Sequence, residues 1–189
     1  MVLEGLSYIA QQAEQTEAYQ YSIDLNKVQE DQLLVELILP TDISDKDLTF
    51  KFPKIIPGTY EISDYGQFVS SLKAFDKKGR EFGVERIDQN TWKISGKKIY
   101  KITYLIQDTW DADIREAIFE PGGTNIEAGK NYVLSANGCF GFFEGKEKLP
   151  YVVTYNRPAN FYATTSLKRI GGDFDSDIFK AQDYHELVD

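Results

Sequence analysis

Apolar and polar residues alternate along most of this chain, and this period of two limits the fold more than any other feature of the sequence. In residues 19–25 every second side chain is apolar, with Gln20, Ser22 and Asp24 between them. The same alternation recurs in residues 33–39, 48–52, 92–94, 100–106, 132–134, 151–155 and 161–163. Alternation of this kind puts one face of a strand against a core and the other toward water.

Turn-forming residues separate these segments. They are Pro40, Pro53 and the pairs Pro57-Gly58, Lys78-Gly79, Ser95-Gly96, Gly122-Gly123, Asn137-Gly138 and Gly171-Gly172. Because proline and glycine interrupt regular structure, the sequence predicts an all-β fold, an antiparallel β-sandwich of about ten short strands with little helix.

Two segments leave their secondary structure open. Residues 64–72 suit a short helix, whereas a strand over residues 67–75 suits the sequence equally well. Residues 178–188 suit either a turn of helix or an extended strand. The chain of 189 residues shows no internal repeat and no linker-like composition, so we expect a flexible leader over residues 1–17 and a single β-sandwich domain over residues 18–189.

Charge and hydropathy limit the partners of the chain. Lys and Arg total 21 against 30 Asp and Glu, and a nucleic-acid binder would need clustered cations, so we expect no nucleic-acid partner. We also expect no membrane span, because no stretch approaches the roughly 20 apolar residues of a spanning helix. The first residues do not form an intact signal peptide, which leaves the compartment open, a periplasmic or secreted location included.

The scarcity of cysteine and histidine excludes several site chemistries. Cys139 is the single cysteine, so the chain has no internal disulfide and no zinc site built from several thiolates. His185 is the single histidine, which rules out HExxH and every other metal site with two imidazoles. We therefore predict no catalytic residue, no metal ligand and no cofactor in this chain.

Asp173, Asp175 and Asp177 have the spacing of a calcium-binding loop. A complete loop needs a glycine next and a bidentate glutamate at its twelfth position, but Ile178 and Tyr184 occupy those places. We therefore expect an exposed acidic turn.

Other reactive side chains have equally plain explanations. The sequence fixes no nucleophile near His185, so we expect a surface or packing histidine. Cys139 lies among glycines and aromatic residues with no Lys or Arg within four positions, which predicts a buried, inert thiol in a tight bend. We expect the acidic pairs Asp111/Asp113 and Glu116/Glu120 to belong to a solvated face.

The aromatic content is unusual, with 12 Tyr, 12 Phe and 2 Trp. Rows of exposed rings on a β-sandwich would suit sugar binding, because flat rings stack on sugar faces. Most of these rings fall on the apolar register of a strand, which favours a core position, and an interface with another domain is a third use.

Several segments follow one another in a recognisable order. They are residues 52–62 (FPKIIPGTYEI), 69–79 (VSSLKAFDKKG), 88–94 (DQNTWKI), 102–104 (ITY), 157–167 (RPANFYATTSL) and 179–189 (FKAQDYHELVD). In this order they resemble the N-terminal domain of family M61 metallopeptidases, the glycyl aminopeptidase group, with its W-x-P-G-x-Y-x-I and D-K-x-T-W-x-V segments and its closing D-Y-D-E-L-V-D. The sequence departs from that pattern at three places: Ile55 or Ile56 and Phe161 or Tyr162 stand for tryptophans, and Ser63-Asp64 lies where a basic residue is usual.

The resemblance implies a fragment, the non-catalytic β-rich N-terminal domain of a zinc aminopeptidase. In that family a thermolysin-like domain follows, and it carries the zinc and the general-base glutamate. The resemblance further implies that this chain packs on the downstream catalytic domain and helps to shape the substrate cleft. The single histidine agrees that the chain alone hydrolyses no peptide.

Pro57, Gly58, Tyr60 and Tyr184 are the candidate interdomain or cleft contacts. Pro57 fixes φ and Gly58 permits a tight bend, so the turn can present Tyr60 rigidly, either to the core or to a neighbouring domain. A domain severed from its partner exposes an apolar face, and we expect self-association through that face.

Two other functions stay open. A free-standing carbohydrate- or ligand-binding β-sandwich module would use the aromatic side chains, and a small hydrolase would use His185. An HExxH segment further along the reading frame would favour the peptidase domain, whereas glycan binding by the purified chain would favour the module.

Overall fold

The computed structural model describes residues 17–41, 43, 45–56, 58, 61–110, 118 and 120–189. Residues 1–16, which make up nearly all of the predicted leader, lie outside this part. Within it no helix is long and apolar enough to cross a membrane.

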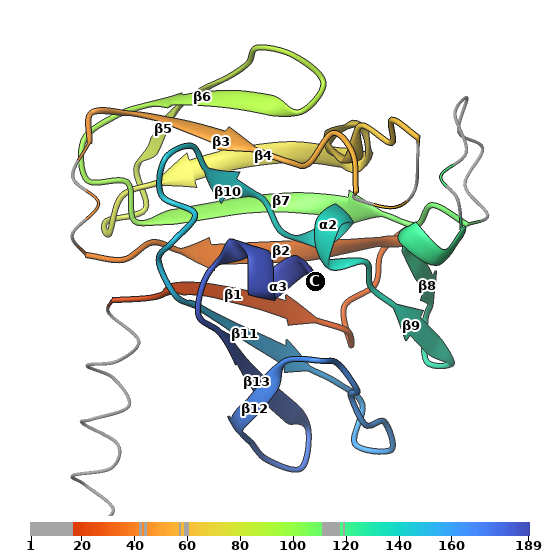
Figure 1. Ribbon diagram of the computed structural model, residues 1–189. Coiled ribbons are helices and arrows are strands. Elements are labelled where there is room, and N and C mark those ends of the chain that lie inside the picture. The colour runs from red at the N-terminus through yellow and green to blue at the C-terminus, as the bar shows by residue number, and fades with distance from the viewer. Residues whose placement is uncertain are drawn as a thin grey trace, which may run out of the picture.

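The fold is all-β, as the alternation predicts (Figure 1). The strands are β1 Tyr19–Asp24, β2 Gln32–Ile38, β3 Asp47–Lys51, β4 Val69–Phe75, β5 Glu81–Arg86, β6 Thr91–Ser95, β7 Lys101–Gln107, β8 Asn125–Glu127, β9 Asn131–Val133, β10 Phe142–Phe143, β11 Tyr151–Asn156, β12 Lys168–Gly172 and β13 Ser176–Ala181. The helices are short: η1 Tyr65–Phe68, η2 Glu120–Gly122, α2 Ala136–Cys139 and α3 Tyr184–Val188.

One sheet of 11 strands runs in the order β10-β3-β6-β5-β4-β7-β2-β1-β11-β13-β12, and β8 and β9 form a separate hairpin. At the β4–β5 junction the pairing is short, with Ala74 opposite Phe82 and Phe75 opposite Glu81. Beyond this junction the sheet folds back, so that Phe50 of β3 lies 5.9 Å from Tyr104 of β7, ring centroid to ring centroid. The two arms of the sheet therefore stack as the layers of a sandwich.

One strand pair departs from the antiparallel expectation. Strands β1 and β11 run parallel, in register from Tyr19 with Tyr151 to Asp24 with Asn156. Parallel neighbours cannot be joined by a hairpin and need a long crossover. The alternation of side chains is the same in both arrangements, so the sequence pattern could not distinguish them.

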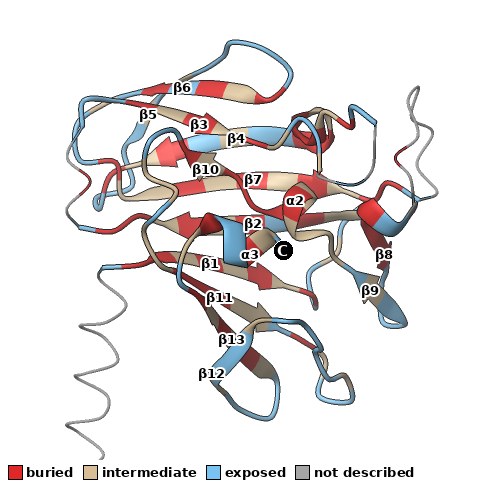
Figure 2. Ribbon diagram, viewed as in Figure 1, coloured by how far each residue is buried: buried red, intermediate tan, exposed pale blue. Residues whose placement is uncertain are grey.

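Burial along the strands follows the predicted period of two. In β1, β2 and β7 buried residues alternate with more exposed ones, and Figure 2 shows this banding. Strands β5 and β12 were not predicted. In β5 only Phe82 and Val84 alternate with exposed residues, which is too short a pattern to mark a strand, and β12 is mostly exposed and carries no clear alternation. Residues 161–163, a predicted strand, form a loop instead.

Both segments that the sequence left open combine the two alternatives. Residues 65–68 form the 3-10 helix η1 and β4 follows at once. Near the C-terminus β13 ends at Ala181 and α3 begins at Tyr184.

Three buried tyrosine hydroxyls hold the segment around α2, two of them from the sheet and one from α3. Tyr21 donates to the carbonyl of Gly141 (2.7 Å), Tyr104 to that of Cys139 (2.7 Å) and Tyr184 to that of Phe140 (2.8 Å). Cys139 is fully buried, which confirms the predicted buried cysteine, and this burial raises the pKa of the thiol to about 12.

The strand register defines two ends of the sandwich. At the first end Lys51 pairs with Thr91 and Val69 with Ile106, so the loops after β3, before β4 and after β7 meet there. At the second end Phe75 pairs with Lys101, which brings together the β4–β5 turn and the segment between β6 and β7. In Figure 1 the first end lies on the right and the second on the left.

Candidate functional site

The loop of residues 53–64 at the first end carries the predicted Pro-Gly turn and is closed at its base. The carbonyl oxygen of Lys54 accepts hydrogen bonds from the amides of Ser63 (3.0 Å) and Asp64 (2.9 Å). These two bonds join the start of the loop to its end.

The predicted contact residues of this loop are described only in part. Gly58 is exposed and has a φ of +93°, a conformation that glycine adopts without strain. Pro57 and Tyr60 lie outside the described residues. Their contacts with a neighbouring domain stay predictions.

Asn90 supports the end of the loop. Its Nδ2 donates to Asp64 Oδ1 (2.7 Å), and its Oδ1 accepts from the amide of Gly66 (2.9 Å). A Cβ at position 66 would lie 2.4 Å from a main-chain oxygen, so η1 can approach this turn closely only with a glycine there. Arg86 adds a hydrogen bond to the carbonyl of Gly66 (2.8 Å).

Two of the segments that resemble the M61 family, residues 52–62 and 88–94, meet here, because the Phe52 amide donates to the carbonyl of Asn90 (2.9 Å). Asp64, where the family pattern has a basic residue, accepts the Asn90 amide and has a left-handed φ of +45°. Its role in this structure is to support the loop.

A second segment, residues 108–110 with residues 120–124, lies beside the loop. Tyr65 donates its hydroxyl proton to the carbonyl of Gly122 (2.9 Å). Thr109 and Thr124 exchange hydrogen bonds, because the Thr109 amide donates to the Thr124 carbonyl and the Thr124 amide donates to Thr109 Oγ1, each at 2.8 Å. The loop therefore rests on a hydrogen-bonded neighbour.

Large apolar side chains are exposed at this end of the sandwich. Ile55 and Ile62, on either side of the loop base, are 50% and 59% exposed, and Trp110 on the neighbouring segment is 41% exposed. We call Ile55, Ile62 and Trp110 the loop platform. Where such side chains form a contiguous patch, they mark a surface that binds other proteins.

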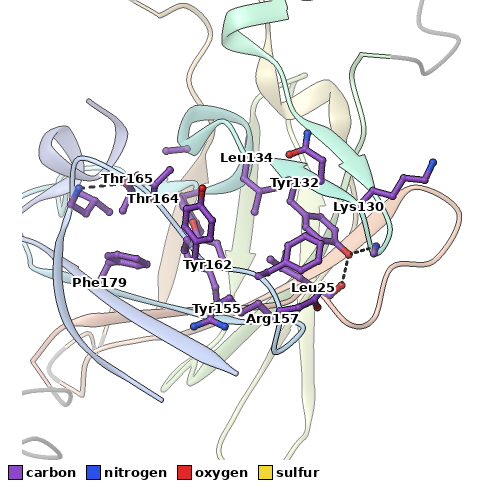
Figure 3. Close-up of a pocket in the computed structure, with 18 of the residues that line it drawn as sticks. Leu25, Lys130, Tyr132, Leu134, Tyr155, Arg157, Tyr162, Thr164, Thr165 and Phe179 are labelled. Atoms are coloured by element: carbon purple, nitrogen blue, oxygen red, sulfur yellow. Dashed lines mark hydrogen bonds between the residues drawn. The ribbon is translucent and has the colours of Figure 1, made fainter. Parts of the chain in front are cut away.

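A pocket of about 640 Å³ opens beside α2 and α3 (Figure 3). Its walls come from the β9 hairpin, from β11 and β13, and from the loop of residues 157–167. Residues that line it include Leu25, Tyr132, Leu134, Tyr155, Phe161, Tyr162, Thr164, Thr165, Phe179 and Leu187. The loop of residues 157–167 and the second half of β13 belong to the two closing segments of the family resemblance.

Aromatic rings form much of this pocket. Tyr132 lies against Phe161, with centroids 5.7 Å apart, and Tyr155 against Phe179 at 6.2 Å. The Tyr132 hydroxyl donates to the carbonyl of Leu25 (2.8 Å), which fixes that ring. Tyr162 is 85% exposed and offers a free ring face to a ligand.

The charged groups of the pocket have partners. Arg157 donates to the carboxylate of Asp177 and to the carbonyl of Phe174 (3.1 Å). Lys130 pairs with Glu127 at 3.8 Å. The pocket therefore suits a neutral ligand with an apolar or ring-shaped face.

Helix α2 connects the loop end with the pocket. A Cβ at Gly138 would contact the Tyr65 ring at 3.4 Å, and Asn137 Nδ2 donates to the carbonyl of Val188 in α3 (3.3 Å). Helix α2 therefore contacts Tyr65, which follows the loop of residues 53–64, on one side and α3, beside the pocket, on the other.

Tyr184, the fourth predicted contact residue, lies in the core of the domain. Its ring packs on Phe142 with centroids 4.7 Å apart, and its hydroxyl is bonded to Phe140. Only 5% of the residue is exposed, so any contact with a further domain has to use that small surface.

The acidic segment near the C-terminus differs from its prediction in one residue. Asp173 and Asp175 are exposed, as expected, and Asp173 accepts from the Ser176 hydroxyl (2.6 Å). Asp177 is buried, because it is bonded to Arg157 and to Arg169 Nε (2.8 Å). The spacing of the three carboxylates resembles a metal loop, but one of them belongs to an ion-pair network.

His185 is exposed on α3, as predicted for a surface histidine. It makes no hydrogen bond with a serine or cysteine in the described part of the chain. Asp111, Asp113 and Glu116 lie outside that part, so the acidic pairs stay untested. Trp110 was not singled out from the sequence, although an isolated tryptophan beyond the end of a strand pattern is a signal for an exposed contact.

The structure is an all-β domain with exposed large apolar side chains at one end. The family described as Peptidase M61 N-terminal domain matches residues 20–189. The chain therefore belongs to this family, as its segments predicted.

A solved structure supports the fold. An aminopeptidase N family protein from Idiomarina loihiensis matches 90% of the chain at 22% identity, with a TM-score of 0.71. The chain spans about 28% of the length of that protein. No curated protein matches the chain.

Proposed function

We propose that this chain is the non-catalytic N-terminal domain of an M61-type zinc aminopeptidase. Its loop platform packs on a downstream catalytic domain and helps to shape the substrate cleft there. The observation that carries the proposal is the loop of residues 53–64, which is closed at its base and flanked by exposed Ile55 and Ile62.

The reactive side chains support a role without catalysis. The Cys139 thiol is buried with its pKa raised to about 12, so little thiolate forms at neutral pH. His185 stands alone on an exposed helix surface, and a second imidazole does not exist in the chain. Zinc and the groups that act with it would therefore belong to the downstream domain.

The Ile62→Asp substitution tests the platform. A carboxylate in an apolar interface loses its water without gaining a partner, so we expect the isolated chain to bind its separately expressed catalytic domain about tenfold more weakly or worse. Calorimetry measures this affinity, and light scattering is expected to show less self-association of the variant. Phe174→Asp is the matched control, since Phe174 is 78% exposed on the β12–β13 turn and carries the same change.

Equal affinity for the wild-type chain and the Ile62→Asp chain would contradict the platform. Peptide hydrolysis by the 189-residue chain alone would contradict the non-catalytic role. Peptidase activity of the longer gene product, lost with a zinc chelator, is the expected companion result.

A second candidate function rests on the aromatic pocket. A sugar or another ring-bearing ligand would stack on Tyr162 and lie against Tyr132 and Phe161. If the chain binds glycans, Tyr162→Ala is expected to weaken binding about tenfold, while Phe174→Ala leaves it unchanged. A glycan array with the purified chain decides between the two functions, and an array without signal removes this one.

A further inference from the structure

A second pocket, of about 560 Å³, lies at the end of the sandwich opposite the loop platform. It is formed by the β4–β5 turn, the segment between β6 and β7, and the residues after β2. Five of the side chains that line it are basic: Lys77, Lys78, Arg80, Lys97 and Lys98. The chain as a whole has an excess of nine acidic residues, so this concentration of cations runs against its overall charge.

The acidic residue of this pocket, Asp76, is fully engaged. Its carboxylate accepts hydrogen bonds from the amides of Lys78 (2.8 Å) and Arg80 (2.9 Å) and from Arg80 Nε (2.7 Å). These bonds, the Arg80 amide first, hold the pKa of Asp76 below its usual range. Asp76 therefore compensates Arg80 and not the lysines.

The four lysines have no carboxylate within ion-pair distance among the residues that the structure describes. Lys78, Lys97 and Lys98 are exposed, and Lys77 Nζ lies over the Tyr100 ring, 5.5 Å from its centroid. Like charges gathered around one concavity repel one another, and an anion bound between them would relieve that repulsion.

Tight turns hold these lysines in place. The Gly79 amide donates to the Asp76 carbonyl (3.0 Å), and Gly79 has a φ of +79°. On the other side, the Gly96 amide donates to the Lys46 carbonyl (2.8 Å), and a Cβ at position 96 would lie 2.4 Å from the Phe82 ring. Main-chain hydrogen bonds and the two glycines therefore fix the conformation of the two turns that carry the lysines.

The floor of the pocket is apolar. Ile99 is 5% exposed and Leu39 is 4% exposed, while the main chain of Tyr100 bonds Phe75 and Leu39 on either side. A ligand that fits both parts carries anionic oxygens toward the lysines and a compact organic body toward the floor.

We propose that this basic pocket binds a small phosphorylated organic molecule. Its volume lies within the roughly 300–1,000 Å³ of small-molecule sites. The oxygens of one phosphate group accept hydrogen bonds from several ammonium groups at once. A phosphorylated ligand therefore fits a cluster of lysines better than a ligand with a single carboxylate does. The site is independent of the loop platform, because it lies at the other end of the strands.

Titration of the 189-residue chain with inorganic pyrophosphate tests the charge recognition, by NMR shifts of the Lys97, Lys98 and Tyr100 amides. The Lys97→Gln/Lys98→Gln double variant is expected to bind about thirtyfold more weakly, through the loss of two lysine–anion attractions. Added salt is expected to weaken the wild-type binding, since the lysines are exposed. Phenyl phosphate carries an apolar ring as well as a phosphate group. It is therefore expected to shift the NMR signal of the Tyr100 amide further than inorganic phosphate does.

Lys148→Gln/Lys168→Gln is the matched control, because both lysines are exposed and lie outside the pocket. It removes the same charge and is expected to leave pyrophosphate binding unchanged. Equal weakening in the two double variants, or no shift with pyrophosphate, would overturn the proposal. Vesicles with anionic phosphatidylglycerol form a separate arm, and binding to vesicles without binding to pyrophosphate would also overturn it.

Discussion

Replacing Asp177 by alanine is expected to lower the free energy of unfolding by about 3–5 kcal/mol, the usual cost of leaving one partner of a buried ion pair alone. Asp177 is 4% exposed and Arg157 is 8% exposed. One carboxylate oxygen accepts from Arg157, which follows β11, and the other accepts from Arg169 in β12. Without the carboxylate the Arg157 guanidinium stays buried and uncompensated.

The effect of Asp177 also depends on pH. The hydrogen bond from Arg157 is the main cause that holds the pKa of Asp177 below its ordinary value. A carboxyl group with a lowered folded-state pKa stabilises fully above its unfolded-state pKa of about 3.9, and the stabilisation is lost as the pH falls through the lower folded-state value. The difference in stability between wild type and Asp177→Asn is therefore expected to be constant from pH 7 to pH 5 and to shrink below pH 4.

Urea denaturation at several pH values measures both effects. Asp175→Ala is the control, because Asp175 is exposed two positions away, and we expect a change of about 0.5 kcal/mol or less there. A loss below 1 kcal/mol for Asp177→Ala would show that water compensates Arg157 in the variant, against the burial seen here.

Replacing Phe50 by alanine is expected to cost about 3–5 kcal/mol, because the substitution leaves a cavity between the two layers. Phe50 is fully buried, and its ring lies 5.0 Å from Phe143 and 5.6 Å from Phe52, centroid to centroid. It also contacts Tyr104 of the opposite layer. The contacts that the variant loses therefore link β3 with β10 in its own layer and with β7 in the opposite layer.

Chemical denaturation of the Phe50→Ala variant measures this loss, and Phe174→Ala is the matched control. Phe174 is 78% exposed, so the same deletion there removes few contacts and is expected to change stability by about 0.5 kcal/mol or less. Similar midpoints for the two variants would mean that the layers do not depend on the Phe50 ring.

The strands with one buried face could be predicted from the sequence, because burial on one face leaves the alternation that marks them. The β4–β5 junction, the parallel pairing of β1 with β11 and the exposed β12 leave no such trace. The buried position of Tyr184 could not be predicted either. Its place in a family-like segment suggested a contact role, but its hydroxyl donates to the carbonyl of Phe140, 44 positions earlier in the chain. Contacts of this kind follow from the tertiary arrangement of the chain.

The same reasoning applies to the candidate sites. The proline and glycine of residues 53–64 predicted a tight turn. Asn90, which supports the end of this loop, lies in residues 88–94, one of the segments that resemble the M61 family. The basic pocket could not be predicted, because Lys77 and Lys98 are brought together by the pairing of β4 with β7. The net charge of the whole chain concealed this local excess of cations.

The parallel pair has a consequence for how the chain is synthesised. As β1 leaves the ribosome it can pair with β2, which follows it directly, but its other edge waits for Tyr151–Asn156. Long-range pairing of this kind slows folding, and an open strand edge can pair with other chains in the meantime. A nascent chain halted before β11 would therefore carry an unpaired strand edge at β1, which stays open to other chains until Tyr151–Asn156 has been synthesised.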